Sequence, residues 1–511
     1  MRRRRHGRVA LFSFAWVTQA WAAGPLGPNG VEITTSDYAL DLFQGPVFAG
    51  SRVTGLAGAY VAISEDVDGD LQNPATPAVR PFFSYSHFDY WLGFGVTFPA
   101  TLKDTDFFNS GSKTQLFNAP DSFVFFVPAT NLQWGEFGIG VTLEVQNYAL
   151  SRPPEAGSSS RGISVTIPTA HVQFAHGFAN NQLVLGLGTR LVSMSLTGPD
   201  RGRSSFDSSG NGLEFGAVWK PQGKPLRLGI AFRTAIRTDA SYSEGFFPDE
   251  NGDLIATVGD DRIYMPKAVA FPWDLNFGFA VQLGARPFNP PWRTTADLVE
   301  RQALTHRMRE LDREDERKAA MATATTRAER AEVARRFKAE QKRDDRRLAR
   351  ELMAARHEIE RNLTAMNRFY VQVAGSAVVS GPVERAVGVE SLVSQTVNRS
   401  GERAVISLRL GVEVGVAPKF LKLRAGTYLE PTRFDSSEPR MHGTAGLDLK
   451  LVRWNVFGLW PDDYMWRLGL GGDAARQYYM WGITIGGWYP RHTNESELPV
   501  PAPTPWGAPV P

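Results

Sequence analysis

The stretch ISLRLGVEVGV, residues Ile406 to Val416, decides the fold class of this chain. Every second residue from Ile406 onward is aliphatic, and the intervening residues are Ser407, Arg409, Gly411, Glu413 and Gly415. Successive side chains of a β-strand point to opposite faces, so this strand has one apolar face and one polar, charged face. Such a strand fits a half-buried sheet of a soluble sandwich, or the wall of a membrane barrel whose apolar face meets lipid.

The same alternation recurs along the chain and predicts about fourteen strands. We place them at residues 82–99, 122–128, 137–145, 163–178, 183–196, 213–220, 226–238, 273–283, 369–379, 406–416, 421–429, 447–456, 464–470 and 479–487. Short turns, such as 131–135 and 179–181, alternate with longer polar segments such as 198–212. This asymmetry is typical of outer-membrane barrels, and it favours an all-β transmembrane barrel of about 14 antiparallel strands over a soluble sandwich.

Composition and the N-terminus indicate an exported protein. Residues 1–22 contain four consecutive arginines and then an apolar run that ends in small residues, which predicts a secretory signal peptide. No other stretch approaches the roughly 18 apolar residues of a membrane helix. The 511 residues include no cysteine, and the net charge of +3 does not favour nucleic-acid binding. We therefore expect the outer membrane as the location and its lipids as surroundings.

Residues 297–367 interrupt the β pattern between the first eight strands (81–296) and the last six (368–490). They contain no glycine or proline, and Leu304, Met308 and Leu311 recur at helical spacing. We predict two antiparallel helices, or one long helix with a break at 323–326, on the periplasmic side. A solvated spacer and a docking arm for a periplasmic protein both remain open. Residues 491–511 are rich in proline and predict an extended tail.

The segment before the first strand carries a resemblance to a known family. It reads GSRVTGLAGAYVAISEDVDGDLQNPA from Gly50 to Ala75, with glycines before Ala59-Tyr60, an acidic stretch, and Asn73-Pro74-Ala75. This resembles the N-terminal signature of the FadL family of outer-membrane transporters for long-chain fatty acids and other hydrophobic compounds. The resemblance implies a barrel of fourteen strands, with residues 23–80 as a hatch inside the lumen. It also implies that an apolar ligand leaves sideways through the wall.

Related barrels with the same signature leave two functions open. The first is transport of hydrophobic molecules such as long-chain fatty acids, with the hatch as gate. The second is a non-transporting scaffold, similar to the secretion-associated PorV-like or conjugation-associated TraF-like barrels, which would recruit a periplasmic protein through 297–367.

Two sets of candidate site residues follow. The candidates for the hatch and the ligand path are Gly50, Gly55, Gly58, Tyr60, Asp66, Asn73 and Pro74. The candidates that line the lumen are Glu144, Arg227, Arg233, Asp274, Arg409, Glu413 and Arg424. Because the second set contains both charge signs, we expect pairs across neighbouring strands that brace the barrel.

No motif in the sequence predicts an enzyme, a cofactor or a metal site, and a hydrolase barrel whose site assembles across strands stays open as an alternative. The eight histidines are scattered, and His171 and His176 fall five apart on a predicted strand, hence on opposite faces. The glycines near 469–472 lack the strand-turn-helix context of a dinucleotide loop. A hydrophobic small molecule is the expected ligand.

Overall fold

The structure is a computed structural model that describes thirteen stretches of the chain. These are residues 26–81, 88–99, 106–111, 123–152, 161–197, 204–242, 247–258, 261–291, 295–365, 369–417, 420–435, 437–453 and 465–488. The predicted signal peptide and the proline-rich tail lie outside these residues.

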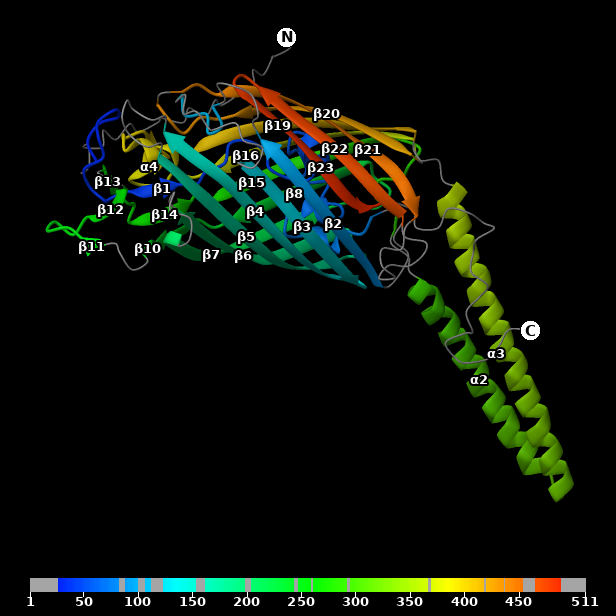
Figure 1. Cartoon of the computed structure of the whole chain (residues 1–511). Helices are drawn as coiled ribbons and strands as arrows, with labels where there is room; N and C mark the ends of the chain where they lie inside the picture. Colours follow the sequence, from blue (N-terminus) through cyan, green and yellow to red (C-terminus); the bar gives the residue numbers. More distant parts are fainter. Residues whose placement is uncertain are drawn as a thin grey trace, which may run out of the picture.

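Fourteen antiparallel strands form a closed barrel (Figure 1). They are β2 (Phe88–Pro99), β3 (Phe123–Trp134), β4 (Phe137–Arg152), β5 (Arg161–Phe178), β6 (Leu183–Thr197), β7 (Ser204–Trp219), β8 (Leu226–Arg233), β15 (Asp274–Gly284), β16 (Tyr370–Ser380), β19 (Val405–Ala417), β20 (Leu421–Glu430), β21 (Arg440–Arg453), β22 (Met465–Ala475) and β23 (Tyr478–Gly487). Each strand pairs with its neighbours in this order, and pairing of β23 with β2 closes the ring. The predicted fold class and strand number are confirmed.

The outer surface of the barrel is apolar. In β19, Ile406, Leu408 and Leu410 are 53%, 58% and 47% exposed, whereas Glu413 on the opposite face is fully buried. Equivalent leucines and phenylalanines are exposed on β4 to β8 and on β15. A continuous apolar surface of this kind is typical of a barrel wall in contact with lipid. In the described part of the chain, no helix is long and apolar enough to cross a membrane.

Several predicted strand boundaries are wrong. Strand β7 begins at Ser204, inside the predicted loop 198–212, and β21 begins at Arg440 rather than at 447. Strand β3 continues to Trp134, where we predicted a turn from 131. The predicted strand 226–238 is broken after Arg233, and its second half joins a different sheet. At the start of β7 the outward residues Asp207, Ser209 and Asn211 are polar, so the alternation of apolar and polar residues disappears there although the strand continues.

A cap of small sheets covers the barrel end that carries the long loops (Figure 1). Its centre is β1 (Ala39–Asp41), which runs parallel to both β14 (Ala268–Phe271) and β17 (Ala386–Gly388). Outer members are β9 (Ile236–Asp239), β18 (Arg399–Ser400), β10 (Ser241–Tyr242), which pairs with β7, a sheet of β11 (Phe247–Pro248), β12 (Leu254–Val258) and β13 (Asp261–Tyr264), and the short helix α4 (Glu390–Ser394). Leu40 of β1 belongs to one apolar core with Val165, Met194 and Phe206 of the wall.

From the cap, the chain passes through the barrel interior before β2 begins. We call residues 46–81 the lumen segment; it contains α1 (Ser51–Gly55) and the 3-10 helices η1 (Val67–Gly69) and η2 (Thr76–Ala78). Helix α1 contacts β20 to β23, η1 contacts β2 and β3, and η2 contacts β3 to β6. Every residue from Ser51 to Pro81 is buried. The lumen is therefore filled by the chain's own N-terminal part.

Two long helices leave the opposite end of the barrel (Figure 1). Helices α2 (Thr295–Thr323) and α3 (Arg327–Ala365) connect β15 to β16 at the end that carries short turns such as 179–182. They pack on each other through the buried Phe337 and Leu348 of α3. At a rise of 1.5 Å per residue, α3 is roughly 58 Å long. We call the pair the helical hairpin.

Candidate functional site

Glycines in the wall mark where the lumen segment passes. A Cβ atom at Gly186 would lie 2.2 Å from the carbonyl oxygen of Pro74. At Gly229 it would lie 2.2 Å from that of Val61, and at Gly411 it would lie 2.5 Å from that of Leu56. Because these neighbours are backbone atoms, no side chain can be accommodated unless the segment moves. The lumen segment and the inner face of the wall are thus fitted to each other.

Arg52 in α1 is the main ionic contact of the lumen segment. Its side chain is buried, and Nε and Nη2 each donate a hydrogen bond of 3.0 Å to the carboxylate of Glu413 on β19. The same guanidinium donates to Asp66 and Glu65 of the segment at 3.4 Å each. A bidentate arginine–carboxylate pair combines strength with a fixed orientation. Arg52 therefore joins α1, the acidic stretch that follows it, and the wall.

The wall side of this contact is a ladder of charges across four neighbouring strands. Glu413 accepts from Arg424 on β20, Arg424 also donates to Asp448 on β21, and Arg467 on β22 pairs with Asp448 at 3.4 Å. Arg467 Nη2 then donates to Asp68 of the lumen segment at 2.6 Å. The ladder thus ends on the lumen segment and fixes it at a second point.

Hydrogen bonds fix the other side of the segment. Arg227 on β8 donates to the Ile63 carbonyl at 2.8 Å and pairs with Glu65 at 3.0 Å. Asn73 Nδ2 donates to the Val61 carbonyl of the segment at 2.9 Å, and to two wall carbonyls at 3.2 and 3.3 Å. Asp70 accepts from Asn131 and Thr142 on β3 and β4. The segment is consequently held from all sides by polar contacts, in addition to the apolar packing of residues such as Val53, Leu56 and Val79.

The structure places all seven hatch candidates in the lumen segment. Tyr60 donates to the Glu65 carbonyl, Gly55 lies against Gly446 of β21, and Gly58 has a positive φ of 72° that favours glycine. The candidates on the wall separate into two groups. Arg227, Glu413 and Arg424 belong to the contact with the segment, whereas Glu144, Arg233, Asp274 and Arg409 surround a cavity.

Sequence reasoning missed half of the ionic contact. Arg52, Asp68, Asp448 and Arg467 were not among the candidates, nor was the pair of His171 and Glu214. Asp448 and Arg467 lie at inward positions of strands whose apolar and polar residues alternate, and this alternation could have identified them. Arg52 and Asp68 lie in irregular chain, where no periodicity indicates which side chains point to the wall.

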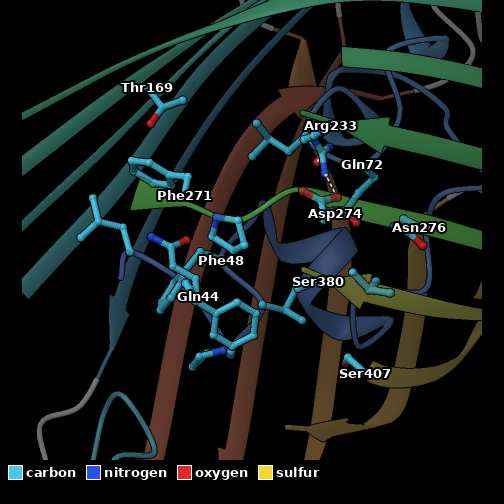
Figure 2. Close-up of a pocket in the computed structure, with 18 of the residues that line it drawn as sticks. Gln44, Phe48, Gln72, Thr169, Arg233, Phe271, Asp274, Asn276, Ser380 and Ser407 are labelled. Atoms are coloured by element: carbon cyan, nitrogen blue, oxygen red, sulfur yellow. Dashed lines mark hydrogen bonds and ion pairs between the residues drawn. The ribbon is translucent and has the colours of Figure 1, made fainter. Parts of the chain in front are cut away.

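A cavity of about 180 Å³ lies between the lumen segment and the wall from β4 to β19 (Figure 2). Leu42, Phe48, Leu71 and Phe271 give it an apolar side. The polar part of the surface includes Thr169, Asn276, Ser380 and Ser407, together with Glu144, His171, Arg190, Arg233, Asp274 and Arg409. Arg233 donates to Asp274 at 3.1 Å, as the dashed line in Figure 2 shows. The cavity therefore combines an apolar surface with several charges in one small space.

Comparison with known proteins gives likenesses of the barrel only. No family model and no curated protein matches the chain. Among solved structures, it is similar to the P. putida toluene transporter TodX, with 12% identity, a TM-score of 0.43, and coverage of 86% of this chain and 97% of that chain. The CymD monoaromatic hydrocarbon channel (11%, 0.43, 88% and 100%) and a Pseudomonas aeruginosa FadL homologue (11%, 0.42, 91% and 100%) are similarly distant. At this distance, the likeness identifies no substrate.

Proposed function

We propose that this protein is an outer-membrane barrel that admits hydrophobic small molecules, with the lumen segment as its gate. The observation that carries the proposal is the filled lumen: every residue from Ser51 to Pro81 is buried inside the wall. A general porin keeps a water-filled channel, and here that space is occupied. Passage therefore requires the segment to move, or a route around it through the wall.

The contacts of the segment fit a gate better than a permanent core. Besides its apolar packing, it is fixed by charges and hydrogen bonds, and water can replace these polar partners when the segment moves. The wall towards the cap is instead apolar, with Val165, Met194 and Phe206 in its core. These side chains are buried against the cap, so a hydrophobic molecule that leaves water would reach them only when the cap or the segment moves. Long-chain fatty acids are one class within this proposal, and lipids of the outer membrane would surround the apolar belt.

A disulfide lock tests the gate. A Cβ atom on Gly93 of β2 would lie 3.7 Å from Cβ of Val67 in the lumen segment, close to the mean of about 3.8 Å for disulfides. The chain has no cysteine of its own, so Val67→Cys with Gly93→Cys introduces a single pair. We expect cells with the oxidised double variant to lose uptake of radiolabelled oleate and toluene, and to regain it on reduction. Each single variant is the control, and equal uptake in both redox states would contradict a moving gate.

A second candidate function rests on the helical hairpin. Leu304, Met308 and Leu311 of α2 are 59%, 63% and 56% exposed, whereas α2 contacts α3 through the charges of Arg313 and His306. An apolar stripe on the free face suits a periplasmic protein partner. Deletion of 297–367 separates the two functions, because transport should largely survive it. Under the scaffold function, the deletion variant should no longer capture a periplasmic protein. If the deletion variant loses uptake as well, the result favours the scaffold over the transporter.

A further inference from the structure

Some of the charged side chains around the cavity form ion pairs with each other, and two of the arginines do not among the described residues. Arg233 is satisfied, because it donates to Asp274 at 3.1 Å and to Glu214 at 2.9 Å. Glu214 also contacts His171 Nδ1 at 3.1 Å, and Glu144 lies 3.6 Å from His171 Nε2. The carboxylates near the cavity are thus engaged by Arg233 and by the imidazole.

Among the described residues, Arg190 of β6 forms no ion pair with a carboxylate, although Asp274, Glu214 and Glu144 act on it electrostatically. Its Nη2 donates to the Thr234 carbonyl at 3.2 Å, and its buried Nε has no hydrogen-bond partner among the described residues. The guanidinium lies 5.8 Å from the ring centroid of Phe271, which also lines the cavity. A buried guanidinium with a free donor favours an anionic acceptor.

Arg409 of β19 is the second such group. Within the described part of the chain, its one hydrogen bond from the guanidinium goes to the neutral Ser407 hydroxyl, at 3.4 Å. Its Nη1 lies over Gly58, so close that a Cβ atom there would be 2.6 Å away. Arg409 therefore joins the cavity to the backbone of the lumen segment. An anion bound by Arg409 would act next to the gate.

The size of the cavity limits what can bind. A volume of roughly 150 Å³ is enough to hold a benzene molecule. The 180 Å³ found here suits a single ring with one small substituent, or a short acyl chain. A long acyl chain would extend beyond this volume. Phe48 and Phe271 offer faces for a ring, and the two arginines offer donors for a carboxylate.

We infer that the cavity binds a small organic carboxylate, with a single ring or a short chain, between Arg190 and Arg409. The inference rests on the proposed transport function, and it adds small amphipathic anions to the hydrophobic molecules that this protein would admit. The ring would pack against Phe48 and Phe271, and the carboxylate would accept from the guanidinium groups. No covalent step is involved.

Calorimetric titration of the full-length barrel in detergent tests the inference with two probes of one shape. Benzoate carries the charge, and benzamide is its neutral counterpart. We expect benzoate to bind at one site, at least tenfold more tightly than benzamide. Arg190→Gln with Arg409→Gln should weaken benzoate at least tenfold and leave benzamide unchanged. Arg335→Gln on the exposed face of α3 is the matched control and should alter neither.

Failure of the inference differs from failure of the proposed function. Equal affinity for the two probes, absent benzoate binding, or full benzoate affinity in a correctly folded double variant would overturn the anion site. Folding is checked by the heat-induced mobility shift of the barrel on gels. If benzoate binds as expected while the disulfide lock leaves uptake intact, the anion site is supported and the moving gate is contradicted. If the disulfide lock blocks oleate uptake but benzoate does not bind, the moving gate is supported and the anion site is contradicted.

Discussion

The lumen segment and the helical hairpin both contain arginine–carboxylate pairs, and they differ in how far water reaches these pairs. Both intersperse arginines with carboxylates. In the lumen, Arg52 and Glu413 are 1% and 0% exposed, whereas the side chains of Arg347 and Glu351 on α3 are 63% and 38% exposed. Exposed pairs contribute little because water and salt compete for them. Breaking a buried pair leaves a charge that nothing solvates. Identical pairs therefore fix the lumen segment to the wall in one place and contribute little to the stability of a helix in the other.

The largest expected effect is at Arg52. Replacement by Met should destabilise the folded barrel by about 3–5 kcal/mol, the usual cost of removing one partner of a buried pair. Glu413 keeps Arg424, so the wall ladder itself should persist. The measurement is the temperature at which the barrel unfolds in the gel mobility shift. Arg347→Met, which breaks an exposed pair, is the control and should leave that temperature unchanged.

The hairpin should be breakable without any effect on the barrel. Phe337 is 6% exposed between α2 and α3, and truncation to Ala should destabilise the hairpin by about 3 kcal/mol. Limited proteolysis should then cut within 297–365, while the unfolding temperature of the barrel stays at its wild-type value. Leu311→Ala, at a side chain 56% exposed, should not increase cleavage. If Phe337→Ala also lowered the unfolding temperature of the barrel, the hairpin and the barrel would be coupled.

A neutral contact of the lumen segment should give a smaller effect than Arg52. Asn73→Ala removes the donor to three carbonyls and the acceptor of the Ala75 amide. Because these buried groups lose their partner, we expect a loss of about 1–3 kcal/mol. The unfolding temperature measures it, with the exposed Asn251→Ala as control. A loss equal to that of Arg52→Met would contradict the special role of charge.

The smallest effect is expected at the start of α3. Hydrogen bonds from the backbone of Thr326 and Thr325 lower the pKa of Glu329, which with Thr326 forms a capping box. A lowered folded pKa stabilises the helix above the unfolded pKa of about 4.3, and this contribution is lost as the pH falls through the folded pKa. At neutral pH, amides 327–330 should exchange hydrogen slightly faster in Glu329→Gln than in the wild type. Near pH 3 the difference should shrink.

The alternation of apolar and polar side chains predicts the strands of the barrel wall, but it does not predict the lumen segment or the cap. One face of β19 meets lipid and the other meets the lumen, so Ile406 to Val416 shows the pattern with period two. The lumen segment has no such period, because its side chains meet different strands at every turn. The resemblance at Gly50 to Ala75 located the segment, but the partner of Arg52 depends on where residue 413 falls in a folded wall. The cap was missed for the same reason: β1 pairs with strands more than two hundred residues away.

Conductance of single barrels in a planar lipid bilayer tests most directly whether buried charges keep the lumen closed. We predict no steady ionic current through the wild-type protein, and openings in Arg52→Met that Arg347→Met does not show. A steady current through the wild type, unchanged in Arg52→Met, would contradict the account, because the lumen segment would then close nothing.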